Sequence, residues 1–400
     1  MKFFPFRSLV PRSDTAAQVT SLGSGKMPLK WLQKRAQDNA LSYLRVVKPE
    51  YIQPELEAGT DAYYAASKAN FDALLNENAL EEWPEGLCYY RQSKPDGSHY
   101  EGWIVGVTAE GYRNGRIVRH ENTIKSKENR LVKYLQTLHA MAEPVLFTQK
   151  LPAAVLTLGK ELGSGAPRLH YTDAQGLVHE LFPLPCTDPR CQQVLESLMQ
   201  LPKVYIADGH HRVAACSTFL EGQEDQGFMA LLLDDEELAI KSFHRVFTDP
   251  SWTQTLEQFQ ADLEALGLNP KPCVMEGLVI QHGECVLMHR EGTLRVQLLK
   301  PESTQADELL DVHQAEIQVL KPLFDVQDSS HDARMSFMRG DTPMSELQEQ
   351  LNEGSIQMAM VLAPCSIDEV KQVGDQGLIM PPKSTWIEPK MQTGMITQLF

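Results

Sequence analysis

The residues best suited to chemistry lie together in one short run, residues 204–212. The run reads Val-Tyr-Ile-Ala-Asp-Gly-His-His-Arg, so a β-branched and aromatic stretch stops at an Asp-Gly turn, and residues 213–216 then begin a helix. A strand, a tight turn and a helix N-terminus present backbone N–H groups and a positive dipole end to an anion. Gly209 lets a ligand approach the backbone because it has no Cβ. The run therefore predicts an anion-binding turn; the alternative is a turn whose polar side chains only face water.

The side chains of this turn could bind a ligand or move protons. Arg212 carries the fork of donors that phosphate and carboxylate groups accept, and His210 and His211 titrate near neutral pH. Because adjacent residues at a helix start point in different directions, we expect only one histidine to face the ligand. We do not expect these residues to bind a metal. Asp208 either orients a histidine or a ligand hydroxyl, or only hydrogen-bonds the following amides in an Asx turn.

A second polar group follows a strand expected at residues 116–119. Glu121, next to His120, is expected to act as a general base or to hold a divalent cation between nucleotide phosphates. The alternative is local, with Asn122 or Thr123 capping the next helix and Glu121 solvated.

Further cations and hydroxyls are expected to contact the same ligand. Residues 383–385 follow two prolines and form a rigid polar loop, and residues 244–245 lie on a strand, where neighbours point to opposite faces. The alternative for residues 383–385 is a polar loop with no ligand, and Lys390 ranks below the others. The ligand-binding set comprises His120, Thr123, Gly209 and Arg212 with Arg130, Arg245, Lys383, Ser384 and Thr385.

Composition limits the class of partner. The chain has 400 residues and a formal net charge of −16, which would repel a polyanion such as DNA over most of its surface. Seven scattered cysteines suit reduced thiols in a cytoplasmic protein. No apolar run reaches the length of a membrane span. We therefore expect a cytoplasmic protein with no nucleic-acid or membrane partner.

Hydrophobic periodicity predicts helices mixed with hairpins, which favours an α+β fold over a doubly wound sheet. The chain length suits two domains, with the break placed at residues 250/251, and the loop at residues 383–385 is expected to fold back towards the run at 204–212. The segment 23–26, Gly-Ser-Gly-Lys, lacks the spacing of a Walker loop. Helices are expected at 29–48, 61–79, 128–141, 189–200, 252–266, 303–324 and 342–352. Strands are expected at 3–10, 87–92, 103–108, 153–158, 177–182, 204–207, 228–233, 240–247, 278–280, 284–289, 294–299 and 358–362.

The motifs also resemble a family. The run at 205–212 is similar to the signature of the DUF1015 family, and segments at 119–131, 243–247 and 380–394 resemble further blocks of that family, in the same order. The Gly-His-His-Arg turn is in turn similar to the Gly-x-x-Arg box of the ParB/sulfiredoxin-like superfamily, which includes nucleotide-dependent free-serine kinases. The resemblance implies a mixed-sheet ParB/sulfiredoxin-like core with helical insertions in residues 1–250, and a C-terminal α+β portion in residues 251–400.

The same resemblance implies a nucleotide ligand, ATP or ADP with Mg²⁺, and a small-molecule substrate. Two departures concern the substrate side: residues 24–28 lack the Pro-Pro-Tyr-Asp turn of the DUF1015 family, and the N-terminal glutamate of the kinases has no assigned counterpart. Our leading hypothesis is a nucleotide-dependent phosphotransferase acting on a hydroxylated metabolite such as free L-serine. Glu121, Asp208, His210 and His211 are the catalytic candidates. The alternative is a non-catalytic nucleotide-sensing protein, and the sequence does not predict an oligomeric state.

Overall fold

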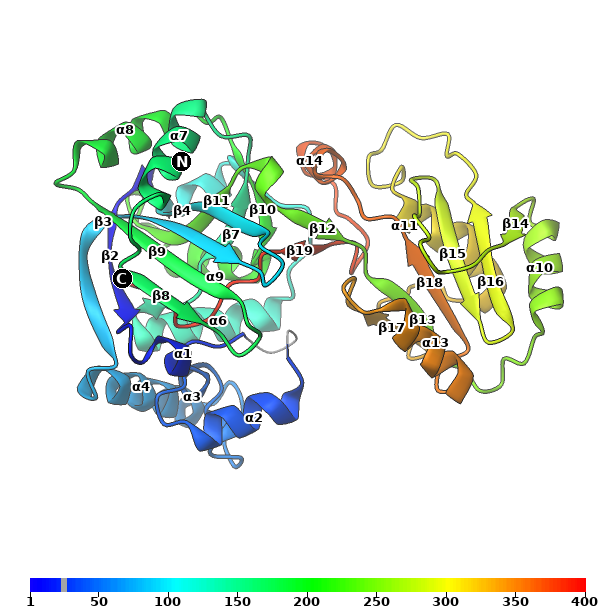
Figure 1. The fold of residues 1–400 in the computed structure, drawn as a ribbon, viewed down its shortest axis with the longest axis horizontal. Coiled ribbons are helices and arrows are strands. Elements are labelled where there is room, and N and C mark those ends of the chain that lie inside the picture. Colours follow the sequence, from blue (N-terminus) through cyan, green and yellow to red (C-terminus); the bar gives the residue numbers. More distant parts are fainter. Residues whose placement is uncertain (23–26) are drawn as a thin grey trace. The chain divides into compact units, whose positions relative to one another are not determined.

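The computed structural model describes residues 1–22 and 27–400 and divides them into two compact units (Figure 1). The first unit comprises Met1–Val118, Asn122–Leu238 and Pro389–Phe400, and the second comprises Arg119–Glu121 and Ala239–Glu388. The change of unit thus falls at 238/239, whereas the sequence placed the break at 250/251. The segment 23–26 lies outside the described residues. In the part of the chain that the structure describes, no helix is both long and apolar enough to cross a membrane.

The first unit is built on a mixed sheet, in which twelve strands of the described residues pair. The main strand order is β5-β10-β7-β11-β4-β3-β2-β20-β6, with β1 on β4, and with β9 joining β3 to β8. Strand β10 runs parallel to β5 and antiparallel to β7. The strands are β1 (Phe3–Phe4), β2 (Phe6–Pro11), β3 (Leu80–Ser93), β4 (His99–Thr108), β5 (Ile117–Val118), β6 (Ala140–Met141), β7 (Val145–Thr148), β8 (Leu169–Thr172), β9 (Val178–Pro185), β10 (Val204–Asp208), β11 (Gly227–Leu233) and β20 (Thr397–Leu399).

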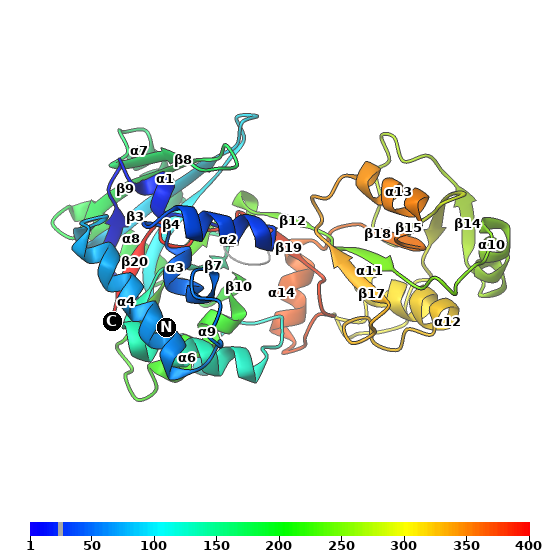
Figure 2. The same cartoon turned by 90° about the horizontal axis from the view of Figure 1, so that it is seen from below.

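Helices of the first unit cover this sheet, and α6 packs against both α4 and α9 (Figure 2). The pairing of α6 with α9 matters for the site because α9 follows β10 directly. The helices are α1 (Ala16–Val19), α2 (Leu29–Asp38), α3 (Leu44–Val47), α4 (Asp61–Asn76), α5 (Glu110–Arg113), α6 (Lys125–Leu138), α7 (Ala153–Gly163), α8 (Pro189–Leu198) and α9 (His210–Phe219), with short 3₁₀ turns at Pro49–Tyr51 and Asp235–Glu237.

The hairpin expected from residues 87–92 and 103–108 is confirmed as β3 and β4, which pair antiparallel. Its turn closes where the Lys94 amide donates to the Ser98 carbonyl at 2.8 Å. Gly97 there takes a φ of +86°, a conformation that favours glycine.

The strand expected at 153–158 is wrong, because these residues form the first part of helix α7. A short apolar run does not distinguish a strand from a buried helix segment by periodicity alone. The deciding residues are Val155, Gly159 and Gly163, which recur every four positions and are buried on one face. A Cβ on Gly159 would lie 2.4 Å from the Tyr89 ring, so the helix approaches β3 as closely as glycine allows.

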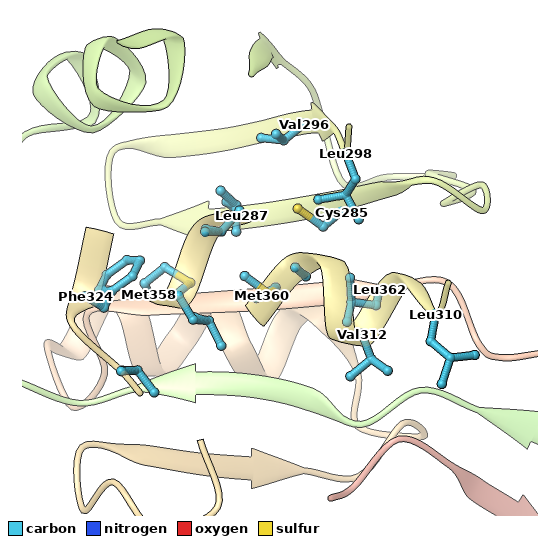
Figure 3. Close-up of a cluster of buried hydrophobic side chains, with 14 of the residues drawn as sticks. Cys285, Leu287, Val296, Leu298, Leu310, Val312, Phe324, Met358, Met360 and Leu362 are labelled. Carbon is cyan, nitrogen blue, oxygen red and sulfur yellow. The ribbon is translucent and has the colours of Figure 1, made fainter. Parts of the chain in front are cut away.

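The second unit contains a six-stranded sheet in the order β14-β16-β15-β18-β13-β17, and a separate pair, β12 with β19. One face of the larger sheet packs against helices around a core that includes Leu287, Phe324 and Met360 (Figure 3). The strands are β12 (Ala239–Lys241), β13 (His244–Phe247), β14 (Asn269–Pro272), β15 (Glu284–His289), β16 (Gly292–Gln297), β17 (Met335–Met338), β18 (Met358–Leu362) and β19 (Trp386–Glu388). The helices are α10 (Leu256–Ala265), α11 (Asp311–Ala315), a π-helical turn (Glu316–Leu320), α12 (Lys321–Phe324), α13 (Met344–Glu353) and α14 (Ile367–Asp375).

Three expectations for the second unit are corrected. Residues 278–280 are not a strand, and β14 pairs with β16 at the edge of the meander instead. The strand expected at 240–247 is two strands, β12 and β13, which belong to different sheets. The helix expected over 303–324 begins only at Asp311. The fold class is α+β, as the mixture of hairpins and helices predicted.

Candidate functional site

The turn between β10 and α9 has the geometry that the sequence predicted. Residues Val204–Asp208 form β10, and Gly209 is the N-cap of α9 with a φ of +100°. The N-cap is glycine, which has no side chain to cap the helix start. The first turn of a helix has backbone N–H groups without an intrahelical acceptor, so this end suits an anion. A Cβ on Gly209 would also lie 3.1 Å from the Arg212 guanidinium. The position therefore favours glycine both because of its positive φ and because of this close contact.

Arg212 lies in the first turn of α9, and its guanidinium contacts two carboxylates. Its Nη2 is 2.7 Å from the Asp208 carboxylate and 3.1 Å from that of Glu143. Its Nη1 donates to the backbone carbonyls of Glu143, at 3.1 Å, and Pro144. The predicted phosphate contact of Arg212 stays a prediction, and it would have to compete with these acceptors.

Lys390 completes a cluster of four charged side chains. Its Nζ donates to Asp208 Oδ1 at 2.7 Å, while Arg212 contacts the other oxygen of that carboxylate, Oδ2. The side chains of Lys390, Arg212, Asp208 and Glu143 are 15%, 19%, 27% and 19% exposed. We call these four residues the charge cluster. Sequence reasoning ranked Lys390 low, since nothing in the spacing shows that residues 389–400 return to the first unit.

The two histidines of α9 have different surroundings, as expected. His210 is buried, with 5% exposure, whereas His211 is half-buried. The Ile124 amide donates to His211 Nε2 at 2.9 Å, so the ring proton of a neutral His211 lies on Nδ1. Burial lowers the pKa of His211 and Lys127 lowers it further, while Glu128 opposes both. A neutral His211 is therefore a hydrogen-bond donor through Nδ1 at neutral pH.

The start of α6 contributes two further predicted residues. The Thr123 hydroxyl donates to the Glu128 carboxylate, and Lys125 contacts the same group at 2.9 Å. The Thr123 bond, followed by that of Lys125, lowers the pKa of Glu128. Arg130 is exposed, and its Nε donates to the Ser126 carbonyl at 3.4 Å. These contacts do not test a phosphate role for Thr123 or Arg130, so both stay predictions.

The remaining predicted residues belong to the second unit. His120 is buried, Glu121 is partly buried, and the His120 carbonyl accepts from the Met380 amide at 2.9 Å. The loop residue Lys383 lies 5.1 Å over the Phe243 ring, and the Ser384 hydroxyl donates to the Pro381 carbonyl at 2.5 Å. Thr385 is partly buried.

Arg245 has no exposed surface and lies 3.6 Å from the Glu316 carboxylate. Because Arg245 is fully buried, a ligand contact would require its neighbours to move. The described structure leaves the ligand roles of the second-unit residues untested.

Mg²⁺ in nucleotide sites is commonly held by one or two carboxylates together with phosphate oxygens. Asp208 and Glu143 are two acids beside α9, but each already contacts the Arg212 guanidinium. In the described residues, no group of three or more His, Cys, Asp or Glu side chains is placed to hold a metal ion. The charge cluster as it stands does not form a ready magnesium site.

One family profile, described as a protein of unknown function (DUF1015), matches residues 3–326. The chain belongs to the DUF1015 family. The match includes the β10–α9 turn of this DUF1015 protein and most of its second unit. A search of curated proteins found no match.

Solved structures similar to the DUF1015 chain are distant. They include a free serine kinase in complex with AMP, at 12% identity over 71% of this chain and 87% of that one, with a TM-score of 0.37. SbnI with C-terminal truncation from Staphylococcus aureus is 13% identical over 71% and 82%, with a TM-score of 0.38. A conserved hypothetical protein from Pyrococcus furiosus is 14% identical over 72% and 93%, with a TM-score of 0.35. At these scores the likeness carries no argument about activity, and membership of the ParB/sulfiredoxin-like superfamily stays a prediction.

Proposed function

We propose that this DUF1015 protein binds the phosphates of a nucleotide, ATP or ADP, at the start of α9 and transfers the terminal phosphoryl group to a small hydroxylated metabolite. Free L-serine is the first acceptor to test. The choice of ligands follows from the resemblance of residues 205–212 to the phosphate-binding turn of the free-serine kinases.

One observation carries the proposal. The helix start at Gly209 has no side-chain cap, and two cations, Arg212 and Lys390, lie on the carboxylate of the residue just before it. Phosphoryl transfer depends mainly on positioning and on neutralising the charge of the phosphate oxygens. Helix amides and two nearby cations supply both, which supports a phosphate site here.

The transfer needs a group that accepts the proton of the acceptor hydroxyl. As the hydroxyl oxygen bonds to the terminal phosphorus, the bond from phosphorus to the nucleotide's bridging oxygen breaks, and the nucleotide leaves one phosphate shorter. Asp208, the residue just before the helix start, is the proposed base, and its contacts with Lys390 and Arg212 also orient these two cations. His211 is the proposed donor to the ligand.

The test is ³¹P NMR of the purified protein with Mg²⁺, L-serine and either ATP or ADP. A phosphomonoester signal that requires serine, and that falls by about two orders of magnitude in Asp208→Asn, is expected. His211→Gln is expected to lower the same signal, and His170→Gln, which changes an exposed histidine of the first unit, is its matched control. Nucleotide binding without a new ester in any of these samples would overturn the transferase proposal.

One observation favours the second candidate, a nucleotide sensor without turnover. The charge cluster pairs two cations with two carboxylates, so its formal charges cancel before any ligand arrives. An incoming phosphate would exchange partners within the cluster, and such an exchange can change conformation without chemistry. If the protein is a sensor, nucleotide should raise its unfolding temperature, but neither phosphoserine nor inorganic phosphate should form.

A further inference from the structure

The last segment of the chain returns to the first unit after the second unit is complete. We call residues 389–400 the C-terminal strap. Its strand β20 lies between β2 and β6 in the large sheet, so the strap is part of the first unit's framework. The chain enters the strap directly from β19 of the second unit.

Three side chains of the strap each contact an acidic residue of the first unit. Lys390 Nζ lies 2.7 Å from Asp208, Gln392 Nε2 donates to Asp173 at 2.6 Å, and the Thr393 hydroxyl donates to Glu143 at 2.7 Å. Two of the three acids, Asp208 and Glu143, belong to the charge cluster. The strap therefore supplies Lys390 to the charge cluster, contacts Glu143 of the cluster through Thr393, and is also attached to Asp173 through Gln392.

The attachment at Gln392 is part of a buried hydrogen-bonded chain. Asp173 Oδ2 accepts from Gln392 and lies 3.1 Å from His179 Nε2, while the Tyr90 hydroxyl lies 2.8 Å from His179 Nδ1. His179 has no exposed surface, and its ring stacks on that of Tyr171 at 4.9 Å. Burial would raise the pKa of Asp173, but hydrogen bonds, first of all from His179, lower it. An ionised, enclosed Asp173 is a rigid acceptor for the strap.

The backbone fixes the strap on the far side of Gln392. Thr393 and Ser21 exchange both backbone hydrogen bonds, at 2.9 and 3.2 Å, and the Gly394 amide donates to the Ala142 carbonyl at 2.8 Å. Gly394 has a φ of +83°, and a Cβ there would lie 2.8 Å from Tyr43. The position of Lys390 is thus set by contacts within the next four residues.

We propose that Lys390 contacts the phosphate of the ligand at the start of α9, and that Gln392 and Thr393 are positioning residues that hold Lys390 there. The proposal rests on the proposed function. A lysine ammonium is a compact charge on a flexible stem, and it can turn from a carboxylate to a phosphate without moving the backbone. Arg212, held by two backbone carbonyls as well as by two carboxylates, is less able to do so.

Stability alone does not account for the charge cluster. Apolar residues of similar volume often stabilise a fold as well as buried ion pairs do, because ion pairs lose hydration. Four partly buried charges beside a helix start whose N-cap is glycine are better explained by a charged ligand. Lys390 comes from the strap, whereas Asp208 ends β10, Arg212 lies in α9 and Glu143 lies just before β7.

The test measures binding of three probes, ATP, ADP and inorganic pyrophosphate, by isothermal titration calorimetry. Lys390→Met is expected to weaken each by about tenfold or more, because it removes a charge-assisted hydrogen bond, and Lys390→Arg to restore part of the loss. Lys68→Met removes a lysine that pairs with Asp72 on α4, also in the first unit, and is the matched control. Equal affinities in Lys390→Met and Lys68→Met would overturn the inference.

A second measurement works on the wild-type protein and does not depend on a variant folding. An amine-modifying reagent followed by mass spectrometry gives the modification rate of each lysine. Saturating pyrophosphate is expected to lower the rate at Lys390 several-fold and to leave Lys68 unchanged. Gln392→Leu is expected to raise the rate at Lys390 and the KM for nucleotide while kcat stays within about twofold; an unchanged rate at Lys390 would remove the positioning role.

The outcomes separate the two proposals. Pyrophosphate binding that depends on Lys390, without phosphoserine, supports the inference and overturns the transferase. Turnover with the same KM and affinity in Lys390→Met supports the transferase and overturns the inference. A wild-type protein that binds none of the three probes overturns both.

Discussion

At the scale of single residues, a substitution at Gly209 would affect both the backbone conformation of the turn, which has a positive φ, and the space that the Arg212 guanidinium occupies. Gly209→Ala is expected to lower the free energy of unfolding by about 1–2 kcal/mol through its positive φ, and by more because the new Cβ would meet the guanidinium at 3.1 Å. Gly97→Ala has a similar φ, +86°, and meets nothing within 4 Å, so it isolates the backbone part. Urea unfolding measures both variants. An equal decrease in the free energy of unfolding in the two variants would mean that the Arg212 guanidinium moves away from the new Cβ at no cost.

His120 is a second single residue with a testable effect, because it makes the free energy of unfolding depend on pH. Burial lowers its pKa from an ordinary value of about 6.5 to about 4. The folded state therefore binds fewer protons, so the contribution of His120 is complete above pH 6.5 and is lost as the pH falls from 6.5 to 4. A shift of this size corresponds to about 3 kcal/mol.

His120→Gln should flatten the decline in the free energy of unfolding between pH 6.5 and 4, measured by urea titrations at several pH values. His170→Gln, on the exposed side of β8, should keep the wild-type slope. A His120→Gln slope equal to that of the wild type would show that the buried ring is not what the acid protonates.

At the scale of elements, residue patterns predicted local secondary structure better than they predicted which strands pair and which distant residues meet. The β10–α9 turn and the β3–β4 hairpin were predictable, because turn residues and alternation mark them within a few positions. The π-helical turn at Glu316–Leu320 and the break between β12 and β13 were not, since tertiary packing decides both. Lys390 was undervalued for the same reason: its partner, Asp208, lies 182 positions earlier in the chain.

Helix α7 offers an element-scale prediction because propensity and packing oppose each other there. Alanine normally stabilises a helix interior relative to glycine, by up to about 1 kcal/mol. Gly159→Ala should instead lower the free energy of unfolding by about 1–3 kcal/mol, since its Cβ would meet Tyr89 at 2.4 Å. Thr157→Ala, exposed on the same helix, should be neutral or slightly stabilising. Chemical denaturation compares them, and a stabilised Gly159→Ala would contradict the close packing of α7 on β3.

At the scale of the whole molecule, the chain leaves the first unit at Leu238 and returns to it at Pro389. Composition and periodicity do not reveal such a return, which is why the sequence set one boundary and missed the strap. The net charge of −16 makes the local gathering of Arg212 and Lys390 more distinctive, since cations are the minority.

Each unit has its own apolar core, so we expect two transitions in calorimetric unfolding. Leu287→Ala, in the core of the second unit, should destabilise one of them by about 2–5 kcal/mol. Leu74→Ala, in a cluster of the first unit, should lower the other. If both substitutions shift a single common transition, the units do not unfold independently.

The most direct test of the central claim is a crystal structure of the protein with ADP. The account predicts phosphate oxygens within hydrogen-bond distance of the backbone amides at the start of α9, with the Lys390 ammonium turned toward them. Nucleotide density elsewhere, with Lys390 and Arg212 still on Asp208 and an empty helix start, would contradict it.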